Sequence, residues 1–159
     1  MPFKWLINIL FRKFKPHPIE KTFKYHFKNK DYLTQALTHR SKVSNPKKNY
    51  ERLEFFGDAV IDIVISKFLM KEFPMGDEGL LTQKRSGLVQ KQFLGSIGNH
   101  LNLVSYLSID SAVNLTDKKV SIRQSANLFE ALIGAMYLDG GLNPCHRIIK
   151  ETIWKHKKE

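Results

Sequence analysis

The most informative segment of the sequence is residues 50–73, YERLEFFGDAVIDIVISKFLMKEF. Four of its five acidic residues stand at positions 51, 54, 58 and 62, so the steps between them are three, four and four residues. This spacing places the four carboxylates along one face of an α-helix. Most residues between them are apolar, and Pro74 follows the stretch. The sequence therefore predicts a long, partly buried helix that carries an acidic stripe and ends before Pro74.

No Lys or Arg follows Glu54 or Asp58 at the spacing of an ion pair on the same helix. The positions three and four residues after Glu54 and Asp58 hold Gly57, Asp58, Ile61 and Asp62. Gly57 costs about 1 kcal/mol relative to alanine inside a helix, which indicates close approach by another backbone or by a ligand. Uncompensated carboxylates suit oxygen-seeking ions such as Mg²⁺ or Mn²⁺. The alternative is a solvated acidic face that pairs with nearby basic residues.

A second acidic residue lies in an apolar stretch with helical spacing, residues 122–138. Glu130 is flanked there by apolar side chains, and Asn127 stands three residues earlier on the same face. Packed against the acidic stripe, these two residues would complete an oxygen-rich pocket. An isolated buried glutamate can instead be a hydrogen-bonded structural residue.

The remaining segments also favour helices. Helical spacing is visible over residues 31–40, 79–100 and 144–156, with Asp77 as a helix cap, whereas strand-like alternation is rare. The single cysteine, Cys145, excludes an intrachain disulfide framework and a cysteine-based zinc cluster. We expect it to be a small apolar residue that is buried or half-buried. The predicted architecture is all-α.

The net charge of +11 is concentrated in the N-terminal third. Residues 1–50 hold 12 Lys and Arg against 2 acids, a net of +10, whereas residues 51–159 hold 14 against 13, a net of +1. This excess favours a polyanionic partner, either a nucleic acid or an anionic membrane surface. No stretch approaches the ~18 apolar residues of a membrane span.

We divide the chain into a basic amphipathic segment, residues 1–18, and one domain, residues 19–159. Apolar residues of the first segment recur at helical spacing up to position 14, and Pro16 and Pro18 end the pattern. Three interpretations remain open for this segment: a helix docked on the domain, an interfacial membrane helix, or a targeting peptide.

Several ordered blocks of the sequence resemble the catalytic domain of the ribonuclease III family. The block NYERLEFFGDAV at residues 49–60 resembles the family signature, and LTHRS at residues 37–41 resembles an early helix end. Further matches are FPMGDEGLLT and RSGLV within residues 73–89, and FEALIGAMYLDGG at residues 129–141. The resemblance extends from about residue 20 to residue 155.

The resemblance implies an all-α domain that forms a symmetric homodimer with a valley for double-stranded RNA. It implies hydrolysis assisted by Mg²⁺, or by Mn²⁺, which leaves 5′-phosphate and 3′-hydroxyl ends. The expected metal ligands are Glu54, Asp58, Asn127 and Glu130. The expected catalytic set is Glu51, Glu54, Asp58, Glu78 and Glu130, in which Glu51 and Glu78 support the site or the dimer and RNA contacts. Asp62 lies outside this set, as a surface or supporting acid.

The chain departs from the family pattern in two respects. The family usually has Asp where Asn127 stands, and an amide oxygen coordinates Mg²⁺ more weakly than a carboxylate does. Many members also carry a double-stranded-RNA-binding domain, which is not in this chain. We interpret the chain as a stand-alone form or a truncation. Basic side chains would then hold the RNA backbone. The expected RNA-binding residues are Lys42, Lys47, Lys48, Lys84 and Arg85.

These observations lead to one principal function and one alternative. The first is a metal-dependent endoribonuclease that processes rRNA or mRNA precursors in the cytoplasm, or in an organelle if the N-terminal segment is a targeting peptide. The alternative is a catalytically impaired member of the family that binds structured RNA or associates with the ribosome. We expect His39 to belong to a structural hydrogen-bond network.

Overall fold

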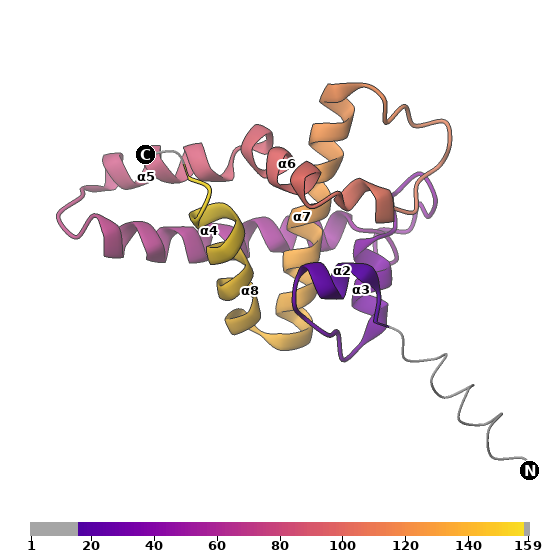
Figure 1. Cartoon of the computed structure of the whole chain (residues 1–159), viewed down its shortest axis with the longest axis horizontal. Helices are drawn as coiled ribbons and strands as arrows, with labels where there is room; N and C mark the ends of the chain where they lie inside the picture. The colour runs from indigo at the N-terminus through magenta and orange to yellow at the C-terminus, as the bar shows by residue number, and fades with distance from the viewer. Residues whose placement is uncertain (1–15, 158–159) are drawn as a thin grey trace, which may run out of the picture.

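The computed structural model describes residues 16–157, and the regular structure there is helical (Figure 1). The α-helices are α2 (Pro18–Thr22), α3 (Lys30–Ala36), α4 (Glu51–Glu72), α5 (Glu78–Val89), α6 (Lys91–His100), α7 (Lys118–Gly140) and α8 (Leu142–Ile149). A 3₁₀ turn spans Leu103–Tyr106, and a π turn spans Lys150–Trp154. The predicted all-α fold is confirmed. The expected amphipathic segment lies outside the described residues except for positions 16–18, and Pro18 begins α2.

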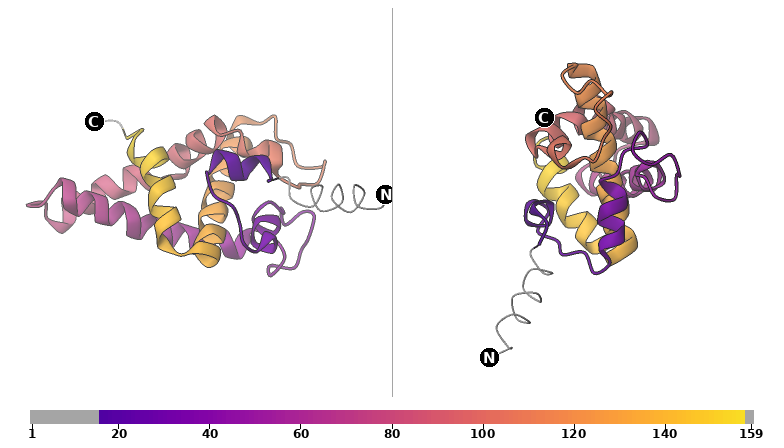
Figure 2. Two further views of the ribbon diagram at one scale, coloured as in Figure 1. Left: turned by 60° about the horizontal axis from the view of Figure 1, so that its bottom comes forward. Right: turned by 90° about the vertical axis from the view of Figure 1, so that its right-hand side faces the viewer.

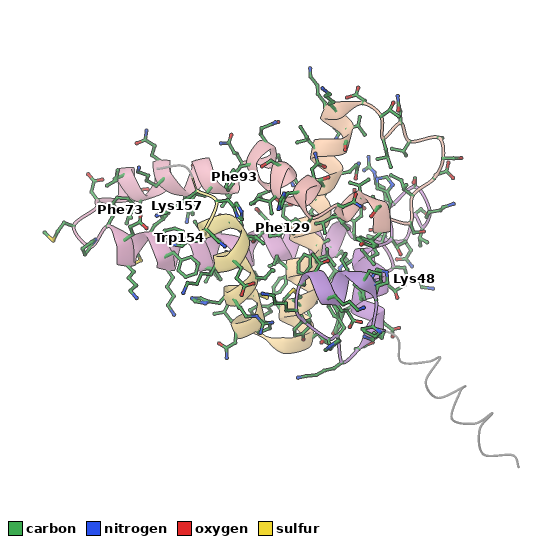
Figure 3. All side chains as sticks on the ribbon, in the orientation of Figure 1. Lys48, Phe73, Phe93, Phe129, Trp154 and Lys157 are labelled. Atoms are coloured by element: carbon green, nitrogen blue, oxygen red, sulfur yellow. The ribbon has the colours of Figure 1, made fainter. Side chains whose placement is uncertain are left out.

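Helix α7 runs through the middle of the domain, and α3, α4, α6 and α8 pack around it (Figures 1 and 2). From residue 124 to residue 136, every residue except Asn127 is buried. Phe129 lies at the centre of the molecule (Figure 3) and packs near Phe23, with ring centroids 6.2 Å apart. A helix that is apolar on nearly all sides belongs in a core. No helix within residues 16–157 is long and apolar enough to cross a membrane.

Two glycines allow α4 and α7 to cross at backbone contact. A Cβ atom on Gly57 would lie 1.8 Å from the carbonyl oxygen of Glu130, and one on Gly134 would lie 2.2 Å from that of Leu53. Any side chain at either position would push the helices apart. The close approach expected at Gly57 is therefore made by another backbone, and it brings Glu54 beside α7.

The predicted helix over residues 79–100 is wrong, because the chain turns at Gln90 and forms two helices. Gln90 has extended backbone angles (φ −62°, ψ 143°), ends α5 and precedes α6. The turn lets α6 pack on α7, where Gly95 and Gly98 meet the carbonyls of Ile122 and Ser125. Burial of α6 against the core outweighs the continuity of the helical pattern.

Other predicted boundaries also shift. Helix α7 begins at Lys118, four residues earlier than residue 122, because Asp117 accepts a hydrogen bond from the Lys119 amide at 2.7 Å and caps it. Helix α3 ends before residue 40, since the Leu37 carbonyl accepts a bond from Ser108 at 2.8 Å. The predicted helix over residues 144–156 is divided into α8 and the π turn.

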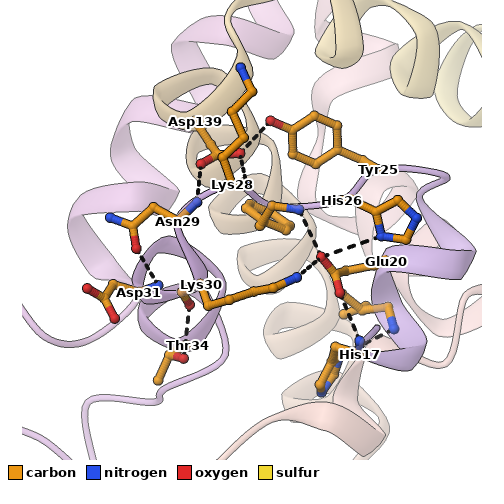
Figure 4. A network of polar contacts seen from close by, with 12 residues as sticks. His17, Glu20, Tyr25, His26, Lys28, Asn29, Lys30, Asp31, Thr34 and Asp139 are labelled. Carbon is orange, nitrogen blue, oxygen red and sulfur yellow. Dashed lines mark hydrogen bonds and ion pairs between the residues drawn. The ribbon is translucent and has the colours of Figure 1, made fainter. Parts of the chain in front are cut away.

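Two carboxylates hold the segment between α2 and α3 in place, Glu20 in α2 and Asp139 near the end of α7 (Figure 4). The buried Glu20 accepts backbone hydrogen bonds from His17 and Phe27, each at 2.8 Å, and pairs with Lys30. Burial alone would raise the pKa of Glu20, but these bonds outweigh it and hold the pKa below its usual value.

Asp139, near the C-terminal end of α7, is held in the same way. It accepts hydrogen bonds from the Tyr25 hydroxyl at 2.6 Å, the Lys28 amide at 2.9 Å and the Asn29 amide at 2.8 Å (Figure 4). These bonds outweigh burial and hold the pKa of Asp139 below its usual value. The segment before α3 is therefore fastened to the central helix by charge-assisted bonds.

The second half of α4 and α5 form an antiparallel arm that projects from the other helices (Figures 1 and 2). Asp77 caps α5, as predicted, by accepting a hydrogen bond from the Leu80 amide at 2.8 Å. The Arg85 guanidinium donates to the Ser66 hydroxyl at 2.9 Å and joins the two helices. Met75, in the turn between them, is 94% exposed.

Candidate active site

A cluster of oxygen atoms from α4 and α7 surrounds one cation, the ammonium group of Lys91. Lys91 Nζ donates to Glu54 Oε1 at 3.1 Å, to Asn127 Oδ1 at 2.9 Å and to Glu130 Oε2 at 2.6 Å. The side chain of Glu130 is 2% exposed and that of Glu54 is 22% exposed, whereas that of Lys91 is 51% exposed. The cluster is thus open to solvent on the side from which Lys91 enters.

The surroundings of Glu130 disfavour its ionised form. Burial raises its pKa to about 7, and the negative charges of Glu54 and Asp58 act in the same direction, against the hydrogen bond and charge of Lys91. The carboxylates in turn raise the pKa of Lys91, although burial alone would lower it. The cluster therefore favours a positive charge at its centre.

Asp58 and Asp62 continue the acidic stripe but do not contact Lys91 in the described structure. Asp58 is exposed one turn after Glu54, close enough for its charge to act on Glu130. Asp62 is half-buried. Burial raises the pKa of Asp62, and the positive charge of Arg85 acts in the opposite direction. The stripe therefore passes from the oxygen cluster onto the arm.

The residues of the cluster fit a divalent metal by the chemistry of their donors. Among residues 16–157, no three His, Cys, Asp or Glu side chains are arranged to hold an ion by themselves. Glu54, Glu130 and the amide oxygen of Asn127 nevertheless converge within 2.6–3.1 Å of a cationic nitrogen. Hard oxygen donors around a cation are what Mg²⁺ and Mn²⁺ require. The convergence around Lys91 shows that the position suits a positive charge.

A family model described as Ribonuclease-III-like matches residues 29–157. The chain belongs to the ribonuclease III family. The protein named Ribonuclease 3 from Ehrlichia canis is 44% identical over 140 residues, which cover 87% of this chain and 62% of the relative. Ribonuclease 3 from Sulfurovum is 38% identical over 130 residues, which cover 82% and 57%. This chain spans about six-tenths of the length of these curated relatives.

Solved ribonuclease III structures have the same fold. The crystal structure of the nuclease domain of ribonuclease III from Campylobacter jejuni has a TM-score of 0.79 and 35% identity, covering 89% of this chain and 95% of that domain. A second structure of that domain, with the same score, is described as flexible in a region involved in dimer formation. Dicer from Pichia stipitis has a TM-score of 0.60 and 26% identity, covering 89% of this chain and 57% of Dicer.

Two residues of the set expected for a ribonuclease III site, Glu51 and Glu78, do not contact Lys91. Glu51, in the first turn of α4, accepts a hydrogen bond from Arg40 at 3.3 Å. Glu78 opens α5 beside the turn of the arm and accepts a bond from the Thr82 hydroxyl at 2.8 Å. Helix α4 has 22 residues, so the turn lies roughly 30 Å from the start of α4. Supporting roles for Glu51 and Glu78 stay predictions.

The expected RNA-binding residues form two groups. Lys42, Lys47 and Lys48 are exposed on the loop before α4 (Lys48 in Figure 3). On the arm, the Lys84 ammonium lies 5.4 Å from the centroid of the Phe73 ring, and Arg85 is half-buried against Ser66. The loop lysines are free of such internal contacts among the described residues, and all five stay predictions as RNA contacts.

Lys91 belongs to this site but is absent from the site residues that the sequence predicted. It lies 37 residues from Glu54 and 39 from Glu130 along the chain, so no local spacing connects them. Two smaller expectations are confirmed. The buried His39 bonds to the Ser41 hydroxyl through Nδ1 at 2.8 Å, and burial lowers its pKa. Cys145 is buried, which raises the pKa of its thiol to about 12.

Proposed function

We propose that this chain is a metal-dependent endoribonuclease that cleaves double-stranded RNA. One observation carries the proposal: oxygen atoms of Glu54, Asn127 and Glu130 converge on a single cation position at the glycine-lined crossing of α4 and α7. Membership of the ribonuclease III family supports it. Processing of rRNA or mRNA precursors in the cytoplasm is the role that we infer from this membership.

The chain's residues would hold Mg²⁺ or Mn²⁺ through two carboxylates and one amide oxygen, with the exposed Asp58 next to them. When bound, such an ion would polarise the phosphate and activate water; attack of that water on phosphorus, with breakage of the P–O3′ bond, would leave 5′-phosphate and 3′-hydroxyl ends. Glu54 and Glu130 supply negative charge, and the amide of Asn127 supplies a neutral oxygen. Loop residues Lys42, Lys47 and Lys48 neutralise backbone phosphates of the duplex.

A symmetric homodimer fits this activity, because two copies place two sites on the two strands of a duplex. Phe55 is 81% exposed at the start of α4, and Leu138 is 47% exposed beside it. These side chains border a cavity of about 720 Å³ that Gln35 and Leu53 also line. An exposed aromatic beside an apolar hollow is typical of a self-complementary interface.

The activity is tested with long duplex RNA, labelled at one 5′ end and incubated with Mg²⁺ or Mn²⁺. We expect staggered cleavage by the natural chain and none by Glu130→Gln. Asn127→Asp should raise the single-turnover rate at least about tenfold, which corresponds to ~1.4 kcal/mol of transition-state stabilisation. Cleavage by Asn127→Asp alone would show that the natural chain is inactive.

The non-catalytic alternative is favoured by one specific observation, the neutral Asn127 next to a lysine that already binds the cluster. In that case the chain would bind structured RNA or the ribosome without cleaving it. Co-sedimentation of the natural chain with ribosomal particles in high salt, together with absence of cleavage, would support this alternative. A free dimer under the same conditions would contradict it.

A further inference from the structure

We propose that Lys91 is a built-in cation that holds the oxygen cluster together without metal and has to be displaced when a divalent metal binds. The inference rests on the proposed metal site and assigns a role to a residue outside the expected ligand set. In this role Lys91 is a positioning residue, because it acts through Glu54, Asn127 and Glu130.

The hydrogen-bond geometry of Lys91 supports this role. An ammonium group has three N–H donors, and each meets one acceptor of the cluster, at 2.6, 2.9 and 3.1 Å. The three acceptors come from two helices that are distant in sequence. One cation therefore joins α4 to α7 next to their glycine crossing. Without a cation, the buried carboxylate of Glu130 would face the negative charge of Glu54 unpaired.

The place of Lys91 in its own helix points in the same direction. Lys91 is the first residue of α6, where the helix dipole disfavours a positive charge. The backbone there is held in place, because Cβ atoms on Gly95 and Gly98 would lie 2.4 and 2.5 Å from carbonyl oxygens of α7. The oxygen cluster compensates for the unfavourable position of the ammonium.

The side chain of Lys91 is nevertheless able to move out of the oxygen cluster. It is 51% exposed and carries a flexible four-carbon stem, so the ammonium can move into solvent without movement of α6. When both are ionised, the two carboxylates that it contacts carry a charge of −2, against +1 for the ammonium. A divalent ion matches that charge better but competes with a tethered cation. Removing Lys91 should therefore tighten metal binding and loosen the metal-free fold.

The test compares Lys91→Met with Lys67→Met in the full chain. Methionine removes the charge and keeps most of the side-chain length. Lys67 is exposed on α4, 13 residues or roughly 20 Å from Glu54, which is beyond the screening length of about 8 Å in physiological salt. Mn²⁺ affinity is measured by electron paramagnetic resonance of free Mn²⁺, without RNA. The midpoint of thermal unfolding is measured in EDTA and in saturating Mn²⁺.

We expect Lys91→Met to bind Mn²⁺ about tenfold more tightly than the natural chain, the effect of one nearby unit charge at an intermediate dielectric constant. In EDTA its unfolding midpoint should fall by several degrees, and saturating Mn²⁺ should abolish the difference. Lys67→Met should match the natural chain in both measurements. Lys91→Gln, which keeps a hydrogen-bond donor, replaces Lys91→Met if circular dichroism shows that the methionine variant is unfolded.

The outcomes separate this inference from the proposed function. Equal or weaker Mn²⁺ binding by the Lys91 variants, with clear binding by the natural chain, overturns the role of Lys91 and leaves the metal site intact. Absence of Mn²⁺ binding by the natural chain and by every variant overturns both. Tighter binding by Lys67→Met as well would reduce the effect to net charge and would also overturn the role of Lys91.

Discussion

Glu20 and Glu130 are both buried, yet their surroundings act on them in opposite directions. Glu20 accepts two backbone amides and pairs with Lys30, which outweighs its burial and keeps its pKa low. Glu130 is paired with Lys91 but also faces the charges of Glu54 and Asp58, and its pKa is raised to about 7. The stabilised carboxylate belongs to the scaffold. The destabilised one belongs to the site, where perturbed groups are commonly found.

The scaffold carboxylate leads to a pH prediction. Because the pKa of Glu20 is below 4.5 in the folded chain, its ionised form stabilises the fold above that pH, and this contribution is lost as the pH falls through the lower folded pKa. We expect Glu20→Gln to lower the free energy of unfolding at pH 7 by about 1–3 kcal/mol and to weaken the acid dependence. Urea unfolding between pH 3 and pH 7 measures both effects.

Asp31→Asn serves as the matched control, because Asp31 is exposed in the first turn of α3 and its loss should cost less than about 1 kcal/mol. An acid profile of Glu20→Gln that is identical to that of the natural chain would contradict this account of Glu20.

At the scale of elements, the crossing of α4 and α7 decides where the site forms. Gly57 and Gly134 bring the two backbones together, so Glu54 from one helix lies opposite Glu130 from the other. Helix α6 then brings Lys91 to the same place, because the chain turns at Gln90. The site is thus a product of helix packing, and a wider crossing would separate its oxygen atoms.

A methyl group added at the crossing should therefore affect both folding and metal binding. We expect Gly57→Ala to lower the free energy of unfolding by roughly 3 kcal/mol or more, since its Cβ would overlap the Glu130 carbonyl. Mn²⁺ binding should weaken in parallel. Gly87→Ala, in α5 with nothing within 4 Å of its Cβ, should instead gain up to about 1 kcal/mol. Equal stability of the two variants would contradict the proposed role of the crossing.

At the scale of the whole molecule, the exposed apolar residues gather in separate places. Phe55 and Leu138 border a hollow at the start of α4, whereas Met75 lies in the turn at the end of the projecting arm. We assign the proposed homodimer to the first of these surfaces, because only there does an exposed aromatic lie beside an apolar cavity among the described residues.

The dimer surface is tested by Phe55→Ser, with Met75→Ser as a control of similar exposure. We expect sedimentation equilibrium to show a dimer for the natural chain and for Met75→Ser, and a shift of at least about tenfold in dissociation constant for Phe55→Ser. Cleavage of duplex RNA should fall with the dimer fraction. A fully dimeric Phe55→Ser protein would place the interface elsewhere.

Spacing within single helices is enough to predict the helical architecture, the acidic stripe of α4 and a close neighbour at Gly57. The packing of the helices reveals what that neighbour is, where α5 ends, and that Lys91 meets Glu54, Asn127 and Glu130. These features depend on contacts between residues far apart in the chain. Helix packing creates such contacts, and no local pattern encodes them.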